Sequence, residues 1–178
     1  KNVIEYPKVA KAVSLKVSTL IKNEIAPQLS KKPTIGIIGN GSMGKAITEK
    51  LIADGYTVFA YDKKQQRNYS HPKAVYYPDA GLLIMSADII IGCTGEDVAV
   101  LEHALDAFLY STQKKWLIST GSKDMEFNSL LEVIQTETKQ QGHIPNPLKD
   151  IKYYAAKSQY FEVRSQRTVS NIERVSKI

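Results

Sequence analysis

Short apolar runs alternate along the chain with segments whose apolar positions recur every three or four residues. The runs are rich in β-branched residues, which predicts buried strands, and they span 34–38, 56–61, 74–77, 88–91 and 116–119. The periodic segments predict helices over 9–25, 45–54, 81–85, 98–109 and 127–134. Strands that alternate with helices predict an α/β fold, a doubly wound parallel sheet covered on both faces.

The pattern changes beyond a break at residues 142–147, which contains Pro145 and Pro147. Two extended runs, 160–163 and 167–172, flank a polar turn at Ser165 and Gln166, which predicts a C-terminal β-hairpin. We therefore divide the chain into an N-terminal helix over 1–30, packed on the rest, and one domain over 31–178 that includes the hairpin.

A glycine motif follows the first predicted strand and opens the next helix. Its residues are Gly39, Asn40, Gly41, Ser42, Met43 and Gly44, a G-x-G-x-x-G pattern. The first glycine permits the tight turn, the second lets a pyrophosphate approach the backbone, and the third lets helix and strand pack closely. The helix N-terminus offers N–H groups and partial positive charge to the phosphates. In this context the motif predicts a Rossmann-type dinucleotide-binding domain.

An acid stands at the end of the second predicted strand. Asp62 follows Gly44 by 18 residues, where a carboxylate can accept hydrogen bonds from the ribose hydroxyls of adenosine and repel a 2′-phosphate. Lys63 and Lys64 come directly after it, and these two cations could hold a 2′-phosphate instead. The prediction is NAD as the cofactor, with NADP left open.

Small residues end two later strands. Thr94 and Gly95 follow one strand, and Ser119, Thr120 and Gly121 end the other. Ligands in such sheets bind outside the carboxyl ends of the strands, so we expect these residues to leave room for the ribose and nicotinamide. The alternative is that the glycines only form turns.

Composition and charge bear on the class of protein, its partners and its location. The chain has 178 residues, is 43% hydrophobic and carries a net charge of +6, which fits one ordinary globular domain. Most of the excess positive charge lies after residue 148, but no Lys/Arg run is denser than a pair, so a nucleic-acid partner is not expected. A single cysteine, Cys93, fits a reducing compartment, and we expect a cytoplasmic protein without a membrane span.

Other polar residues suggest little chemistry. Cys93 follows a strand without a nearby base, and we interpret it as a small hydrophobic residue. The histidines His71, His103 and His143 do not have metal-ligand spacing, so no metal site is predicted. The acids Asp79, Glu96, Asp97, Asp124 and Glu126 are acid/base candidates, with Asp124 the better candidate for a helix N-cap. No catalytic residue can be assigned.

The chain resembles the NAD-binding domain of the S-adenosylhomocysteine hydrolase (adenosylhomocysteinase) family. That family's phosphate loop reads G-Y-G-D-V-G-K-G, where this chain has G-N-G-S-M-G-K-A over 39–46, and its T-T-G is matched by Cys93, Thr94 and Gly95. Its N-I-G-H-F-D-x-E aligns with residues 119–126, and its late strands align with 160–172. The resemblance implies tightly held NAD and a ribose-binding role for Asp62.

The departures from that family are informative. Ser119 and Ser122 replace an Asn and a His that contact the nicotinamide end, and Lys8 has no accompanying Asp. Nothing in the chain corresponds to the family's substrate domain, so we expect the chain alone not to perform the hydrolase reaction. A substrate domain elsewhere, or a second copy of the chain, would have to complete an enzyme. The start at Lys1 rather than Met fits a piece of a longer protein.

Two alternatives stay open. Residues 35–44, together with Tyr61 and Asp62, also resemble the start of 3-hydroxyisobutyrate and 6-phosphogluconate dehydrogenases, whose helical second domain with its catalytic lysine has no counterpart here. The chain could also be a stand-alone module that senses a nucleotide and regulates a partner. The main prediction is the NAD-binding domain of an adenosylhomocysteinase-like protein.

Overall fold

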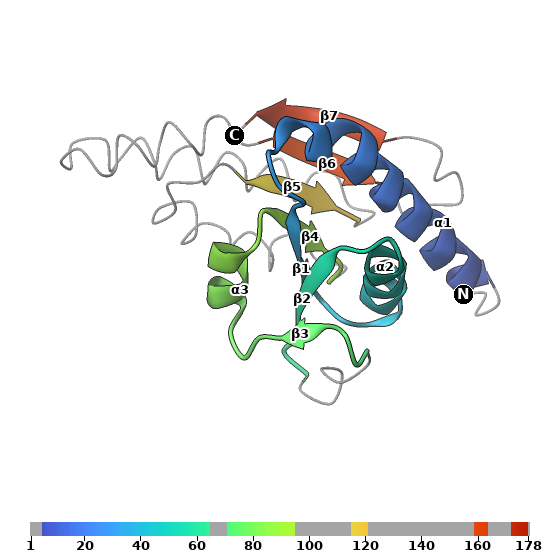
Figure 1. Ribbon diagram of the computed structural model, residues 1–178. Coiled ribbons are helices and arrows are strands. Elements are labelled where there is room, and N and C mark those ends of the chain that lie inside the picture. The colour runs from blue at the N-terminus through green and yellow to red at the C-terminus, as the bar shows by residue number, and fades with distance from the viewer. Residues whose placement is uncertain (1–4, 65–70, 95–114, 121–158, 164–171, 178) are drawn as a thin grey trace, which may run out of the picture.

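The computed structural model describes residues 5–64, 71–94, 115–120, 159–163 and 172–177 (Figure 1). Three α-helices are present in these ranges: α1 (Glu5–Leu20), α2 (Ser42–Ala53) and α3 (Ala80–Ser86). A π-helical turn, η1 (Ile21–Ile25), and a 3₁₀ turn, η2 (Ala26–Gln28), continue α1. The strands are β1 (Thr34–Ile38), β2 (Thr57–Tyr61), β3 (Val75–Tyr76), β4 (Ile89–Gly92), β5 (Trp116–Ser119), β6 (Gln159–Val163) and β7 (Ile172–Lys177).

The first five predicted strands are confirmed, with bounds that differ by at most one residue. The predicted first helix is also found, but its last turn is π-helical, with the amide of Ala26 bonded to the carbonyl of Ile21. Helix α2 begins at Ser42, three residues earlier than expected, inside the glycine motif. The predicted helices over 98–109 and 127–134, and the break at 142–147, lie outside the described residues.

Five parallel strands form a Rossmann-like sheet in the order β3-β2-β1-β4-β5. The order reverses at β1, which lies between β2 and β4. Crevices that bind ligands in such sheets open at this reversal, beyond the carboxyl ends of the strands. Beyond β5 the sheet continues with β6, which is parallel to β5, and with β7, which is antiparallel to β6.

The predicted C-terminal hairpin is not shown. Its second strand was expected over 167–172 after a turn at Ser165 and Gln166, whereas β7 starts at Ile172, and the link between β6 and β7 lies outside the described residues. The residues that pair with β6 are Ile172 to Lys177. Local alternation therefore did not fix the register.

Helices cover both faces of the sheet (Figure 1). Helices α2 and α1 lie on one face, with α1 packed along α2, and α3 lies on the other, against β1 and β2. The shared core holds the central strands and the apolar side of α1 and η1, including Val13, Val17 and Ile21, all fully buried. This agrees with the apolar periodicity that predicted the first helix.

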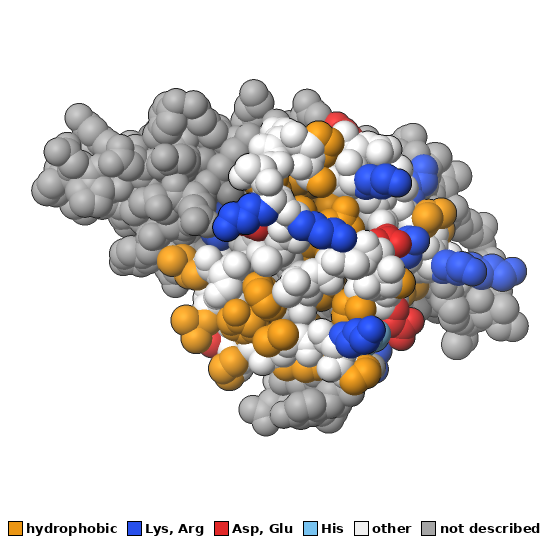
Figure 2. Space-filling view, in the orientation of Figure 1, with side chains coloured by type: hydrophobic (Ala, Val, Ile, Leu, Met, Phe, Trp, Pro, Cys, Tyr) orange, Lys and Arg blue, Asp and Glu red, His pale blue; other side chains and the backbone are white. Residues whose placement is uncertain are grey.

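The face of the sheet that α3 covers carries an exposed apolar area. Hydrophobic side chains gather at the lower left of Figure 2, over α3 and β3; Val75, Leu82 and Met85 are exposed there. Within the part of the chain that the structure describes, no helix combines the length and apolar character needed to cross a bilayer. The cytoplasmic location stays a prediction.

Candidate dinucleotide site

The carboxyl ends of four neighbouring strands meet at one edge of the sheet. The glycine motif leaves β1 there, Asp62 follows β2, Cys93 and Thr94 follow β4, and Thr120 follows β5. The structure thus brings together the described members of the predicted site. Gly95 and Gly121 lie outside the described residues.

Gly39 makes the turn at the end of β1. Its φ of 97° lies in the left-handed region that favours glycine. A Cβ at this position would lie 2.7 Å from the carbonyl oxygen of Cys93, so the loop after β4 also leaves no room for a side chain. The amide of Gly39 donates to the carbonyl of Tyr61 at 2.8 Å, which ties the motif to the end of β2.

Gly44 lets α2 approach the end of β1. A Cβ on Gly44 would lie 1.9 Å from the carbonyl oxygen of Gly39, so contact between helix and turn depends on the missing side chain. Gly41 is different, because its φ of −77° and ψ of −158° suit most residues. Packing within the protein therefore requires glycine at positions 39 and 44. The backbone conformation at position 41 does not require glycine.

Helix α2 starts at this edge without a side-chain cap. Gly41 occupies the N-cap position and has no side chain to accept a hydrogen bond from the first turn. The N-terminal N–H groups of a helix carry partial positive charge. This end of α2 is thus suited to an anionic group of a ligand.

Asp62 holds the glycine motif in place. Its side chain is buried, with 6% of its surface exposed. One carboxylate oxygen accepts from the amide of Asn40 at 2.7 Å, and the other accepts from the amide of Lys64 at 2.8 Å. The carboxylate thereby links the glycine motif to the turn after β2, while the side chains of Lys63 and Lys64 stay exposed. Sequence reasoning identified Asp62 but missed this positioning role.

The β4 and β5 ends form the other half of the site. The amide of Cys93 donates to the carbonyl of Ile38 at 2.8 Å, and the Thr94 side chain is exposed. Ser119 and Thr120 are buried. The Thr120 hydroxyl donates to the carbonyl of Gly92 at 2.8 Å, so its proton is already used in joining β5 to β4.

Two of the other candidate residues, Asp79 and Cys93, are described by the structure, and both have structural roles. Asp79 is the N-cap of α3, where its carboxylate accepts from the amide of Leu82 at 3.2 Å; an acid/base role for it stays a prediction. Cys93 is partly buried against the hydrophobic core, as expected of a small apolar residue. Glu96, Asp97, His103, Asp124, Glu126 and His143 lie outside the described residues. Among described residues, no group of three metal-ligating side chains comes together.

Sequence reasoning also missed a buried lysine at the opposite edge of the sheet. Lys115 is 1% exposed, and its ammonium donates to the carbonyls of Ala87 at 2.7 Å and Met85 at 3.3 Å, at the end of α3. Burial lowers the pKa of Lys115 to about 8, although the charge of Asp88 opposes this shift. A single lysine beside a strand gave no signal of its burial.

The chain matches a known family over most of its length. The family of the NAD-binding domain of 6-phosphogluconate dehydrogenase matches residues 34–142. This range starts at β1 and includes the glycine motif, Asp62 and the ends of β4 and β5. No curated protein matches the chain in sequence.

Solved structures share the fold. An imine reductase variant from Myxococcus stipitatus, in complex with NAD+, is 20% identical with a TM-score of 0.52, over 75% of this chain and 41% of its own. A 3-hydroxyisobutyrate dehydrogenase from Mycobacterium tuberculosis is 18% identical with a TM-score of 0.51, over 60% and 38%. An NADPH-dependent glyoxylate/hydroxypyruvate reductase from Sinorhizobium meliloti, in complex with NADP and malonate, is 15% identical with a TM-score of 0.53, over 77% and 48%. The chain thus spans less than half the length of each.

The family match overturns the predicted relation to adenosylhomocysteinase. The hydrolase function that this relation implied is wrong as well, and the competing resemblance to the 6-phosphogluconate and 3-hydroxyisobutyrate dehydrogenases is the better one. The error has a physical origin. The glycine motif and the acid after β2 serve dinucleotide binding in many α/β proteins, so they do not separate one such family from another. The ligand class that the match supports is a dinucleotide, NAD or NADP.

Proposed function

The chain belongs to the family of the NAD-binding domain of 6-phosphogluconate dehydrogenase, and from this premise we propose that it is the cofactor domain of a dehydrogenase of the 6-phosphogluconate, 3-hydroxyisobutyrate or imine reductase type. In this role it holds a nicotinamide dinucleotide while hydride moves to or from a small substrate. Another domain, or a second copy of the chain, supplies the rest of the substrate site.

The uncapped start of α2 beside Gly41 carries this proposal. Gly39 and Gly44 are explained by contacts within the protein, whereas Gly41 is explained by a ligand that must approach the backbone. We assign the pyrophosphate to the first turn of α2 and the loop before it. The residues of this subsite are Gly39, Asn40, Gly41, Ser42, Met43 and Gly44.

Asp62 supports NAD as the cofactor rather than NADP. The amides of Asn40 and Lys64 hold this carboxylate at the end of β2, where the adenosine ribose of a dinucleotide lies in this type of fold. A carboxylate at this position can accept hydrogen bonds from the ribose hydroxyls of adenosine, and its negative charge disfavours a 2′-phosphate. Lys63 and Lys64 are exposed beside it and would favour NADP if Asp62 acted only as a loop anchor.

The β4 and β5 ends would accept the nicotinamide half. We assign Thr94, Gly95, Ser119, Thr120 and Gly121 to this subsite. The hydroxyl proton of Thr120 is hydrogen-bonded to the carbonyl of Gly92, so Thr120 contributes shape rather than a donated hydrogen bond.

We also propose that residues 1–30 are a helical extension packed on a domain spanning 31–178, because α1 shares the core of the sheet.

Two substitutions test the pyrophosphate and ribose assignments in calorimetric titrations. Gly41→Val places a side chain in the pyrophosphate path and should abolish NAD+ binding, while thermal unfolding reports whether the domain remains folded. Unchanged affinity in a folded variant would sink the glycine-motif assignment.

Asp62→Ala should weaken NAD+ binding by about 1–3 kcal/mol, the usual effect of losing a charged hydrogen-bond acceptor. Lys63→Ala combined with Lys64→Ala is the matched comparison. If NADP+ is the tighter ligand of the wild type and this double variant loses it, then the lysines rather than Asp62 set the cofactor preference.

A further inference from the structure

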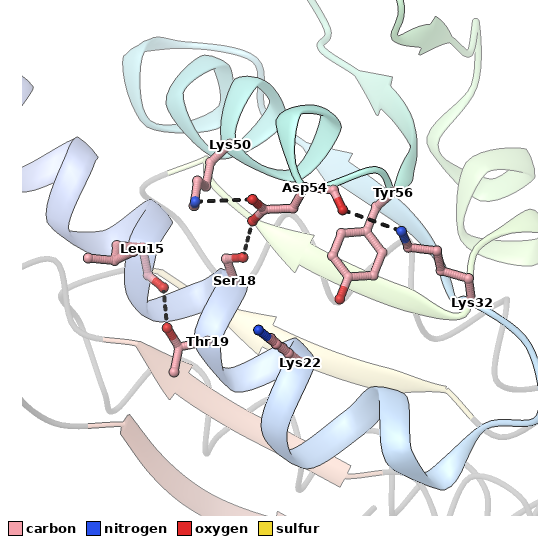
Figure 3. A pocket seen from close by; sticks show the side chains of 8 residues that line it. All are labelled: Leu15, Ser18, Thr19, Lys22, Lys32, Lys50, Asp54 and Tyr56. Carbon is pink, nitrogen blue, oxygen red and sulfur yellow. Dashed lines mark hydrogen bonds and ion pairs between the residues drawn. The ribbon is translucent and has the colours of Figure 1, made fainter.

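A pocket lies between α1 and the far end of α2 (Figure 3). Its volume is about 480 Å³, within the range of small-molecule sites. Helix α2 has 12 residues and spans about 18 Å, so the pocket and the glycine motif lie at opposite ends of one helix. The lining residues are Leu15, Ser18, Thr19, Lys22, Lys32, Lys50, Asp54 and Tyr56.

Asp54 is the one carboxylate in this lining, and its charge is already matched. It accepts a hydrogen bond from the Ser18 hydroxyl and forms an ion pair with Lys50 at 3.1 Å. The pKa of Asp54 is lowered, chiefly by the Ser18 hydrogen bond and also by Lys50, so the carboxylate stays ionised. Asp54 and Lys50 together leave no net charge.

Two further ammonium groups enter the pocket from other segments. Lys32 donates to the main-chain carbonyl of Asp54 at 3.3 Å and lies 4.9 Å from the centre of the Tyr56 ring. A Cβ on Gly55 would lie 2.7 Å from this ammonium, so the glycine leaves room for it. Lys22 comes from η1 and lines the pocket on the side of α1 (Figure 3). The lining therefore has three lysines against one carboxylate, a net charge of +2.

The rest of the lining suits the body of an organic ligand. Leu15 is 57% exposed beside the lysines and offers an apolar contact. Burial and the charge of Asp54 raise the pKa of Tyr56, so its phenol keeps the proton that it can donate. The pocket thus combines hydrogen-bond donors and positive charge at its centre with apolar surface at its edge.

We propose that this pocket binds a small organic phosphate. A phosphate monoester carries about two negative charges at neutral pH, which balances the two ammonium charges that Asp54 does not match. Hydrogen bonds between ammonium groups and phosphate oxygens are stronger than those between neutral groups. The organic part would lie on Leu15 and on the Tyr56 ring, because the pocket is larger than a bare phosphate requires.

The test is an amide NMR titration of the full chain with saturating NAD+. The probes are inorganic phosphate, glycerol 3-phosphate and glucose 6-phosphate, with glucose as the uncharged comparison. At least one organic phosphate should give saturable shifts at Thr19, Gly55 and Tyr56 and bind more tightly than inorganic phosphate, while glucose gives none. Absence of saturable shifts with all three phosphates, or shifts confined to the glycine motif, overturns the proposal.

A charge-matched pair of variants identifies the lysines. Lys22→Gln combined with Lys32→Gln should weaken binding of the organic phosphate at least about tenfold, since even one lost charged hydrogen bond is worth about that much. The control, Lys8→Gln combined with Lys11→Gln, removes the same charge from α1 outside the pocket and should change affinity less than about twofold. Equal weakening of phosphate binding in both double variants would mean that the overall positive charge of the protein attracts the phosphate, and would overturn the site. NAD+ affinity is measured in parallel, so failure here is distinct from failure of the dinucleotide site.

Discussion

Replacing Gly44 and Gly41 by alanine should separate a glycine needed for packing from one needed for a ligand. In Gly44→Ala the new Cβ would start 1.9 Å from the Gly39 carbonyl oxygen, whereas ordinary contact begins at 3.4 Å. Helix and turn must therefore separate by about 1.5 Å. The obstructing atom belongs to the main chain and cannot rotate away, so we expect a loss of about 3 kcal/mol, the upper end for overpacking.

For a chain of this length, 3 kcal/mol lowers the midpoint of thermal unfolding by about 6–12 °C. Gly41→Ala should cost only about 1 kcal/mol, the difference between glycine and alanine at an N-cap, but should weaken NAD+ binding at least about tenfold. Differential scanning calorimetry and isothermal titration measure the two effects. A Gly44→Ala protein that unfolds within 1–2 °C of the wild type, roughly the effect of 0.5 kcal/mol, would refute the packing argument.

Further predictions concern the sheet and its amino edge. In Gly36→Ala the Cβ would lie 2.4 Å from a terminal carbon of Leu83, so we expect the free energy of unfolding, measured with urea, to fall by about 1–3 kcal/mol. Adding Leu83→Ala removes the contacted side chain, so the effects of the two substitutions on this free energy should not add. Strict additivity would contradict the contact. The pKa of Lys115 falls from 10.5 to about 8 on folding, so between these pH values the unfolded chain holds a proton that the native state lacks. The free energy of unfolding should therefore rise with pH across this window, by about 3 kcal/mol in all. Lys115→Met should remove that rise, and an identical pH dependence in wild type and variant would refute it.

The periodicity of apolar residues predicted the central fold well, because buried strands and amphipathic helices leave local signals. Strand β1 was predicted with its observed bounds, Thr34–Ile38. The start of α2 was missed because Ser42 and Gly44 are poor helix formers, and the helix gains stability there from its contact with the end of β1. The π-helical turn at Ile21–Ile25 was missed because its sequence fits an ordinary helix equally well.

The candidate dinucleotide site was only partly predictable, because its contacts join segments that lie far apart in the sequence. The glycine motif and Asp62 form a pattern in sequence, but the hydrogen bond from Asn40 to Asp62 joins segments 22 residues apart. In the pocket at the other end of α2, the contact of Ser18 with Asp54 spans 36 residues, and neither residue stands out in the sequence. Family membership also needed more than the motif, because similar phosphate loops serve many dinucleotide-binding proteins.

Direct titration of the wild-type chain with NAD+ and, separately, with NADP+ tests the central claim. We expect saturable 1:1 binding of NAD+ with micromolar or tighter affinity and weaker binding of NADP+, because the N-terminus of α2 holds the pyrophosphate and Asp62 the ribose. Binding of neither dinucleotide by the folded chain would contradict the proposal that this edge of the sheet is a cofactor site.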